Sequence, residues 1–587
     1  MNNRYLKLGV GLLLGLSAID ASAVRATKEP IQVTQPDGTV ITVRLTGDER
    51  SHSTYTLDGE LLLKDQEGYY CYATIGEDGY PVASATRVKP FVRPMFESGH
   101  KEDVEAARVR KQAAQGRNPR FIFSGNAFPA YGEPRGLVVL VEYKDKAFSM
   151  SDPNAFFDNQ LNGENYTQYG ATGSARDYFI RNSNGIFKPH FDVLGPVKLS
   201  NNYSYYCKNV GYWEEDAHPE EMILESLKAL DADHDFSVYD YDNDGYIDNV
   251  FVIYAGYGEA DSNIENTIWP HSADLVDYDI TLPTHDGVKP NRYAMTCELD
   301  YTYKRPDGIG TFVHEFSHVL GLPDLYHTTD SYAYYTPGEW SVLGYGPYNN
   351  KGRTPPAYSI HERYSLDWMT PEQLQYTGDY TLQPITATNF GYIIPTEKEN
   401  EMFLIESRYK TGDDLYIPNS GMLVWHIDFD QSVWNDNAVN NNKSHQYVDL
   451  IEADNKPDTS SDSSTKSGDC FPGKNNVTSL SFTTTPSLQS WGKKSTGIEF
   501  SKIKLNADGS VSFHIEGKES GIESVATTGN VYCNRGILYN EGEEACEVYD
   551  VAGRKIGKTA AGGTMTLPGT GLYIVANSEG VVKVMSK

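Results

Sequence analysis

The sequence has 587 residues, of which 39% are hydrophobic and 22% charged, and this composition excludes a disordered, collagenous or coiled-coil chain. At this length we expect several globular domains with sizeable cores. The 80 Asp and Glu residues outnumber the 50 Lys and Arg residues, giving a net charge of -30. We therefore expect no nucleic-acid partner, because phosphate binding needs a cationic face, whereas acidic side chains can bind hard cations such as calcium.

The N-terminal residues predict export. Arg4 and Lys7 precede the apolar run Leu8–Ile19, and Ala21-Ser22-Ala23 forms a cleavage pattern of the A-x-A type. The run is too short to span a bilayer comfortably, and no later run reaches about 18 apolar residues, so we expect no membrane span. We predict a signal peptide over residues 1–23 and a secreted protein, either extracellular or attached to the cell surface.

Short strands and Asp-Gly turns follow the signal peptide. The strand candidates are Ile31–Val33, Val40–Leu45 and Tyr69–Tyr72. Residues 99–120 are then polar and basic, which is typical of a solvated linker helix and equally of a protease-sensitive junction that releases a propeptide. We predict a β-rich unit with a linker over residues 24–120, and composition alone does not decide between the two interpretations of the linker.

Central strands and helices alternate in the next segment. Gly136–Glu142 and Asn249–Ala255 are continuous apolar runs, which favour strands covered on both faces. Helical patterns lie between them, near Gly173–Asn182 and over Pro219–Leu230. These elements predict an α/β domain over residues 121–374.

Strand patterns without long helices return near the C-terminus. The clearest strand candidates are Gly421–Asp428, Val511–Ile515, Cys546–Asp550 and Gly571–Ala576. They predict a β-sandwich over residues 375–517 and a small β domain over residues 518–587.

The motif H-E-x-x-H-x-x-G-x-x-D, which begins at His314, is the most informative part of the chain. On a helix, His314 and His318 project from one face and can share one metal ion. Gly321 can end that helix and Pro323 prevents its continuation, so the chain turns sharply and returns Asp324 as a third ligand. Three protein ligands leave one position for water, as in a catalytic zinc site.

Glu315 follows the first histidine and can reach the metal-activated water. The zinc ion lowers the pKa of that water and polarises the scissile carbonyl, while Glu315 acts as the general base and returns the proton. An alternative third ligand is a downstream glutamate, Glu339 or Glu362, as in thermolysin-like peptidases. The tight turn after the helix favours Asp324.

These residues resemble the metzincin-like zinc peptidases, and in particular the M6 family of secreted bacterial peptidases typified by immune inhibitor A. Further segments that resemble the family are Gly173–Phe179, Phe191–Pro196, Trp269–His271 and Gly421–Asp428. The resemblance spans roughly residues 130–517. It implies a zymogen in which residues 24–120 act as an inhibitory propeptide.

One departure from that family concerns the methionine turn beneath the zinc. Leu343, within Gly338–Gly346, stands where the methionine is expected. Leu and Met are nearly isosteric, and such swaps usually cost less than about 1.5 kcal/mol, so we expect the turn to keep its role.

An acidic loop upstream predicts calcium binding. Asp240, Asp242, Asp244 and Asp248 stand at positions one, three, five and nine of an EF-hand-like pattern, with glycine at position six and Tyr246 at position seven. Position twelve is a phenylalanine rather than a glutamate, so the pattern is incomplete. An acidic surface turn without an ion is the alternative.

The last 70 residues resemble the C-terminal sorting domains of type IX secretion in Bacteroidetes. The resemblance rests on Val548–Lys555, Leu567–Ile574 and Lys583–Lys587. It implies the type IX secretion machinery as a partner. The alternative is a small Ig-like domain that only stabilises the protein.

The sequence thus predicts a multidomain protein: a metzincin-like α/β zinc peptidase domain flanked by a β-rich prodomain, a β-sandwich and a small C-terminal β domain. The predicted activity is that of a secreted zinc metalloendopeptidase, a hydrolase acting on protein or peptide substrates, with structural calcium. The alternative is a surface adhesin or binding protein whose metalloprotease-like domain has lost activity.

Overall fold

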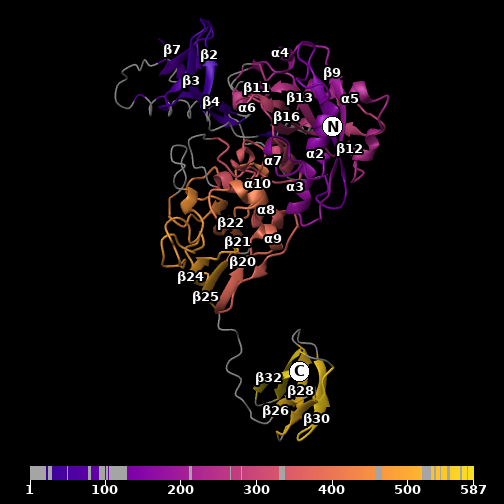
Figure 1. Cartoon of the computed structure of the whole chain (residues 1–587), viewed down its shortest axis with the longest axis vertical. Coiled ribbons are helices and arrows are strands. Elements are labelled where there is room, and N and C mark those ends of the chain that lie inside the picture. The colour runs from indigo at the N-terminus through magenta and orange to yellow at the C-terminus, as the bar shows by residue number, and fades with distance from the viewer. Residues whose placement is uncertain are drawn as a thin grey trace, which may run out of the picture. The chain divides into compact units, whose positions relative to one another are not determined.

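In the computed structural model the chain divides into two compact units (Figure 1). The first comprises Met1–Leu374 and Asp379–Ile515, and the second comprises Gln375–Gly378 and Glu516–Lys587. The structure describes residues 21–23, 30–48, 51–76, 81–90, 100, 104 and 128–586, the last range with gaps at 211–214, 263, 265, 279, 330–336, 399, 457–465, 518–530, 535–536, 543, 551–554, 569–570 and 578–579. Most of the predicted signal peptide and linker lies outside these residues.

The N-terminal segment is an antiparallel meander whose sheet order follows the chain. Its strands are β2 (Ile31–Thr34), β3 (Val40–Asp48), β4 (Ser51–Thr56), β5 (Leu61–Lys64), β6 (Tyr70–Ile75) and β7 (Pro81–Arg87). The three predicted strands are confirmed. Val43, Leu62 and Tyr72 lie in one small core on a face of this sheet.

The segment predicted as the peptidase domain, residues 121–374, is called the peptidase segment below. It is built on a mostly parallel sheet of order β1-β14-β16-β13-β8-β9, with β17 paired to β16. The strands are β1 (Ala21–Ala23), β8 (Arg135–Glu142), β9 (His190–Lys198), β13 (Val250–Tyr257), β14 (His271–Asp274), β16 (Arg292–Asp300) and β17 (Arg305–Pro306). β8, β9, β13 and β16 run parallel, whereas β14 is antiparallel to β16. The two predicted central strands are confirmed as β8 and β13.

Both faces of this sheet are covered, which explains the continuous apolar runs. Along β8, Val138 and Leu140 enter one core while Leu137, Val139 and Val141 enter the other. Helices α2 (Pro153–Asn162), α3 (Ala175–Asn182) and α7 (Ile309–Val319) pack in the first core, and α5 (Pro219–Leu230) packs in the second. Ser174 and Asp177 form a capping box at the start of α3.

Shorter elements join these layers. They are α4 (Tyr203–Tyr206), β10 (Asn209–Val210) with β11 (Glu215–Asp216), β12 (Tyr246–Ile247) with β15 (Lys289–Pro290), α6 (Glu259–Ser262), α8 (Ile360–Ser365), α9 (Ile385–Thr388) and α10 (Gln431–Asn435).

Two further sheets follow in the same compact unit. The first has the order β18 (Glu372–Gln373), β20 (Tyr392–Pro395), β21 (Glu401–Arg408), β22 (Gly421–Asp428), β23 (Val448–Leu450), and the second β19 (Gly378–Leu382), β25 (Val511–Glu516), β24 (Glu499–Leu505). Residues of both sheets, such as Phe403 and Phe513, share one core.

The opposite face of β22 packs against the peptidase helices. Leu423 and Trp425 belong to the same core as α7, whereas Met422 and Val424 enter the core between the two sheets. In Figure 1, α7 accordingly lies between the parallel sheet and β22. β22 is buried on both faces, and Met1–Leu374 and Asp379–Ile515 belong to one compact unit, whereas Gln375–Gly378 belong to the other.

The second unit consists of two small sheets. One contains β26 (Val531–Asn534), β27 (Ile537–Asn540) and β30 (Thr564–Thr566), and the other has the order β29 (Lys555–Thr559), β28 (Cys546–Asp550), β31 (Gly571–Asn577), β32 (Gly580–Ser586). Its two predicted strands are confirmed. Among the described residues of the whole chain, no helix is long and apolar enough to cross a membrane.

Candidate active site

Helix α7 positions the H-E-x-x-H residues. Phe312, Phe316 and Val319 anchor the helix in the core beneath the parallel sheet. The helix ends in a Schellman motif, in which Gly321 adopts a φ of 101° and its N–H donates to the His318 carbonyl at 2.9 Å. The predicted stop at Gly321 is confirmed. The chain then turns back towards the histidines.

Three donor atoms converge at this turn. His314 Nε2 and His318 Nε2 are 3.2 Å apart, and Asp324 Oδ1 lies 3.3 Å from the first and 3.4 Å from the second. All three side chains are at most 1% exposed. The structure therefore brings together the three residues that the spacing predicted as ligands.

The tautomers of the two histidines follow from their other nitrogens. His314 Nδ1 lies 2.8 Å from the Val342 carbonyl and His318 Nδ1 lies 2.7 Å from the Leu322 carbonyl. A carbonyl only accepts hydrogen bonds, so each Nδ1 carries the proton and donates. When the two rings are neutral, the lone pairs on His314 Nε2 and His318 Nε2 therefore point towards each other and towards the Asp324 carboxylate. Such an arrangement is unfavourable without a cation, and two imidazoles with one carboxylate form a donor set that suits zinc.

Asp324 is held by a residue that local motif reasoning missed. Asn437 Nδ2 donates to Asp324 Oδ2 at 2.7 Å, and its Oδ1 accepts from the Asp324 N–H at 2.8 Å. Burial would raise the pKa of Asp324, whereas the two histidines, when also protonated at Nε2, lower it below its ordinary value. Burial likewise lowers the pKa of His318. Asn437 has no spacing relation to the motif, so only the fold reveals it.

The alternative ligands lie in other environments. The Glu339 carboxylate forms an ion pair with Lys466. Glu362 is fully buried, where it accepts from the Ser341 hydroxyl and caps α8 through the N–H of Ser359. Neither belongs to the group of donor atoms that could share one ion with His314. The geometry thus favours Asp324.

Glu315 is fully buried on α7, next to the first histidine. Leu343 is also buried, at 1% exposure, and its carbonyl accepts from the Leu325 N–H at 2.9 Å. The residue before it, Val342, binds the ring of His314. The turn therefore contacts the His314 ring through its backbone.

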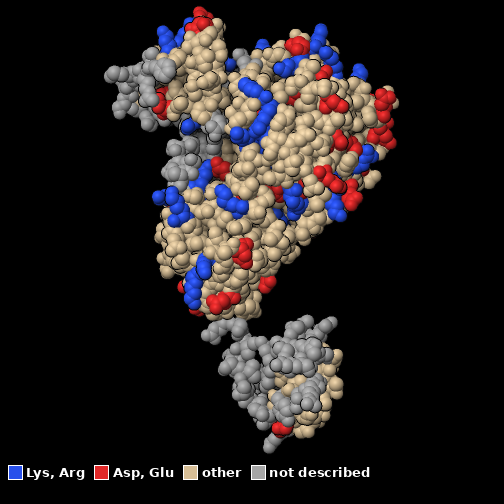
Figure 2. All heavy atoms as spheres, in the orientation of Figure 1, with Lys and Arg blue, Asp and Glu red and all other residues tan. Residues whose placement is uncertain are grey.

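The acidic loop precedes β12, near an edge of the peptidase segment where acidic side chains gather in Figure 2. Carboxylate oxygens of Asp240, Asp242 and Asp244 lie within 4.8 Å of one another. Asp244 Oδ1 accepts the N–H of Tyr246 at 2.8 Å. Asp248 is 3% exposed and lies outside this group of three, and burial raises its pKa to about 8.

Comparisons with known proteins agree with the motif. Residues 137–380 match the family described as "Immune inhibitor A peptidase M6, catalytic domain". "Pre-pro-metalloprotease PrtV" from two strains of Vibrio cholerae serotype O1 is 26% identical over 280 residues, which are 42% of this chain and 30% of the relative. "Immune inhibitor A" from Bacillus thuringiensis subsp. alesti is 26% identical over 264 residues, or 38% of each chain.

The aligned part thus covers about a third of the length of these curated relatives. Together with the family match, it shows that this part of the chain is similar to the catalytic domain of M6 metallopeptidases.

Proposed function

We propose that this protein is a secreted zinc endopeptidase in which His314, His318 and Asp324 bind the metal and Glu315 is the general base. The observation on which the proposal rests is the convergence of two imidazole nitrogens and one carboxylate oxygen within 3.4 Å of one another. When bound, zinc activates a water molecule and polarises the carbonyl of the scissile peptide bond. Activity on casein that a chelator abolishes and zinc restores tests this proposal.

The protein's own residues would orient and move protons. The backbone carbonyls at Val342 and Leu322 hold the two histidine rings so that Nε2 faces the metal. Asn437 fixes the carboxylate of Asp324. Glu315 accepts the proton of the attacking water and then gives it to the leaving amine.

The second candidate function is that of a surface adhesin or binding protein whose metalloprotease-like domain has lost activity. Leu343 is the only residue of the candidate site that favours it. The buried position of Leu343, beside the carbonyl that binds His314, supports an intact turn instead. A zinc-loaded, processed protein without peptidase activity on any broad substrate would favour the binding protein.

We also propose that the N-terminal segment is an inhibitory propeptide. Leu45 of β3 clusters with Ala260 and Trp269 of the peptidase segment, and the Tyr301 hydroxyl donates to the Gln32 carbonyl at 3.3 Å. The Vibrio relative is named as a pre-pro-metalloprotease. Both observations support a segment that docks on the peptidase until export is complete.

Processing is expected between Lys101 and Arg135, with activity rising as the N-terminal fragment is lost. The expected cleavage sites follow Arg110, Lys111, Arg117 or Arg120. N-terminal sequencing of protein from the culture medium locates the site, and glutamine at these four positions should slow processing. Fully active enzyme that still begins near Val24 would show instead that the segment is a permanent domain.

The acidic loop is proposed as a structural calcium site with Asp240, Asp242, Asp244, Asp248 and the backbone of Tyr246. Three carboxylates within 4.8 Å repel one another, and a divalent cation would offset that repulsion. The loop leads into β12 and β13, so an ion there would brace the central sheet.

Calcium is expected to raise the melting temperature of the zinc-loaded protein by several degrees. An ion present at about 100 times its Kd adds about 2.7 kcal/mol of stability. Differential scanning fluorimetry across micromolar to millimolar calcium measures the shift. The double variant Asp242→Asn, Asp244→Asn should melt at a calcium-independent temperature, and an equal shift in this variant and the wild type would place the ion elsewhere.

The C-terminal unit is proposed as a sorting domain for type IX secretion, which would attach the protein to the cell surface or release it. Its two small sheets share a compact core, which supports an independent domain. Intracellular retention of a chain truncated after residue 517 would support this assignment, and normal export would contradict it.

A further inference from the structure

A cavity of about 230 Å³ lies beside the first turn of α7. One wall contains Thr311, which precedes Glu315 by one helical turn on the same face of the helix. The opposite wall contains Tyr345 and Tyr348, from the loop that follows Leu343. The cavity therefore shares both its helix and its loop with the candidate active site.

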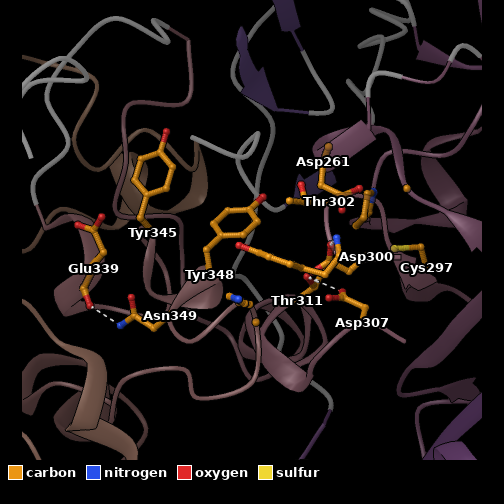
Figure 3. Close-up of a pocket in the computed structure, with 16 residues that line it drawn as sticks. Asp261, Cys297, Asp300, Thr302, Asp307, Thr311, Glu339, Tyr345, Tyr348 and Asn349 are labelled. Atoms are coloured by element: carbon orange, nitrogen blue, oxygen red, sulfur yellow. Dashed lines mark hydrogen bonds between the residues drawn. The ribbon is translucent and has the colours of Figure 1, made fainter. Parts of the chain in front are cut away.

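Tyr348 interacts electrostatically both with carboxylates of the cavity and with Glu315 of the candidate active site. Burial raises the pKa of its phenol well above the ordinary value, and the nearby carboxylates of Asp261, Asp307 and Glu315 raise it further. In Figure 3, Tyr348 lies between Glu339 and the three aspartates of the cavity. The cavity therefore lies one helical turn along α7 from Glu315.

The three aspartates come from separate segments: Asp261 from α6, Asp300 from the end of β16, and Asp307 from the turn before α7. Asp300 is only 8% exposed, and Asp261 Oδ1 is buried without a hydrogen-bond partner in the described structure. Their other hydrogen bonds come mainly from the backbone: Tyr301 N–H to Asp261, Tyr303 N–H to Asp300 and Gly308 N–H to Asp307.

None of these aspartates forms an ion pair with a described lysine or arginine. The nearby cations have other partners: Lys304 lies 3.1 Å from the Tyr301 ring centroid, Lys351 lies 4.1 Å from that of Tyr303, and Arg353 donates to backbone carbonyls. Burial and the charge of Asp300 raise the pKa of Asp307 to about 7. Lys304 offsets part of the charge of Asp261, and Arg353 part of that of Asp307. The lining itself holds three aspartates and Glu339 against one lysine, Lys351, and a bound cation would offset this excess of carboxylates.

We propose that this cavity binds the lysine or arginine side chain of a substrate residue flanking the scissile bond. The inference rests on the proposed endopeptidase function and adds its specificity. The apolar stem of such a side chain would pack on the rings of Tyr345 and Tyr348 while its charged end pairs with the aspartates. An acidic substrate residue would be repelled, and a neutral one would leave the carboxylates unpaired.

The first test uses the processed, zinc-loaded wild-type enzyme on a peptide library with mass-spectrometric identification of the cleaved bonds. Lysine and arginine should be enriched at one fixed position next to the cleaved bond. For two matched fluorogenic peptides that differ only by lysine against norleucine at that position, kcat/KM should favour lysine by about tenfold or more. Equal rates for the two peptides, or enrichment of apolar or acidic residues, would overturn the inference without any variant.

The second test uses amide variants, which keep the size of each side chain. The triple variant Asp261→Asn, Asp300→Asn, Asp307→Asn should cut the ratio of kcat/KM for the lysine peptide to that for the norleucine peptide to within about threefold. Asp158→Asn, an exposed change on α2, is the control and should keep the full preference. A folded triple variant with the wild-type preference would overturn the assignment to these residues.

The outcomes also distinguish a failure of the proposed specificity from a failure of the proposed endopeptidase function. Zinc-dependent cleavage without a basic preference leaves the endopeptidase proposal intact and removes only the specificity. A zinc-loaded protein that cleaves no peptide removes both. High salt should weaken the lysine preference in the active enzyme, because the pairing is electrostatic and the cavity opens to solvent.

Discussion

Replacing Glu315 by glutamine is expected to abolish peptide hydrolysis while the metal stays bound. Glutamine has nearly the same size, so the fully buried position keeps its packing. It cannot accept the proton of the attacking water, and loss of a general base costs about 10²–10⁴ in rate. Because the same group also returns the proton to the leaving amine, we expect kcat/KM to fall by about 10³ or more.

Two measurements on the same preparation check this expectation. Peptidase activity on casein or a fluorogenic peptide gives the loss, and elemental analysis gives the zinc content per chain. Glu164→Gln, an exposed glutamate of the same segment, is the matched control and should retain both activity and metal. Retention of a tenth or more of the activity by Glu315→Gln would assign the general base to another residue.

The zinc helix could be predicted from sequence because its determinants are local. The spacing of His314 and His318 fixes one helix face, and Gly321 supplies the left-handed residue that the end of the helix requires. The central strands were predictable for a similar reason. Burial on both faces leaves a continuous apolar run, and β8 and β13 follow the two runs closely.

Other features depend on contacts between distant segments. Asn437 lies 113 residues after the aspartate it holds, and no local pattern relates the two. The cavity aspartates likewise come from three segments that only the fold brings together. The same limit applies to the packing of β22. The sequence of β22 shows that the strand is buried, but it does not show that its two faces belong to different cores.

The second large effect is expected at the third zinc ligand, Asp324. Asp324→Ala is expected to lose most of the bound zinc and, with it, the peptidase activity. The two histidines alone would leave the ion with only two protein ligands, fewer than the three of a typical catalytic zinc site. Asn437→Ala removes the hydrogen bond to Asp324 and is expected to weaken zinc binding less than Asp324→Ala does. Losing the hydrogen-bond partner of a metal ligand typically lowers metal affinity by about 10–100-fold.

Zinc affinity measured by competition with a chromogenic chelator separates these cases. Glu339→Gln and Glu362→Gln are the matched controls, since each removes the charge of an alternative ligand and keeps its size. Both should bind zinc as tightly as the wild type, because Glu339 pairs with Lys466 and Glu362 with Ser341. If Glu362→Gln or Glu339→Gln lost the metal while Asp324→Ala kept it, the site would follow the thermolysin-like pattern. The sharp return of the chain at Gly321 would then only pack the core and would not deliver a ligand.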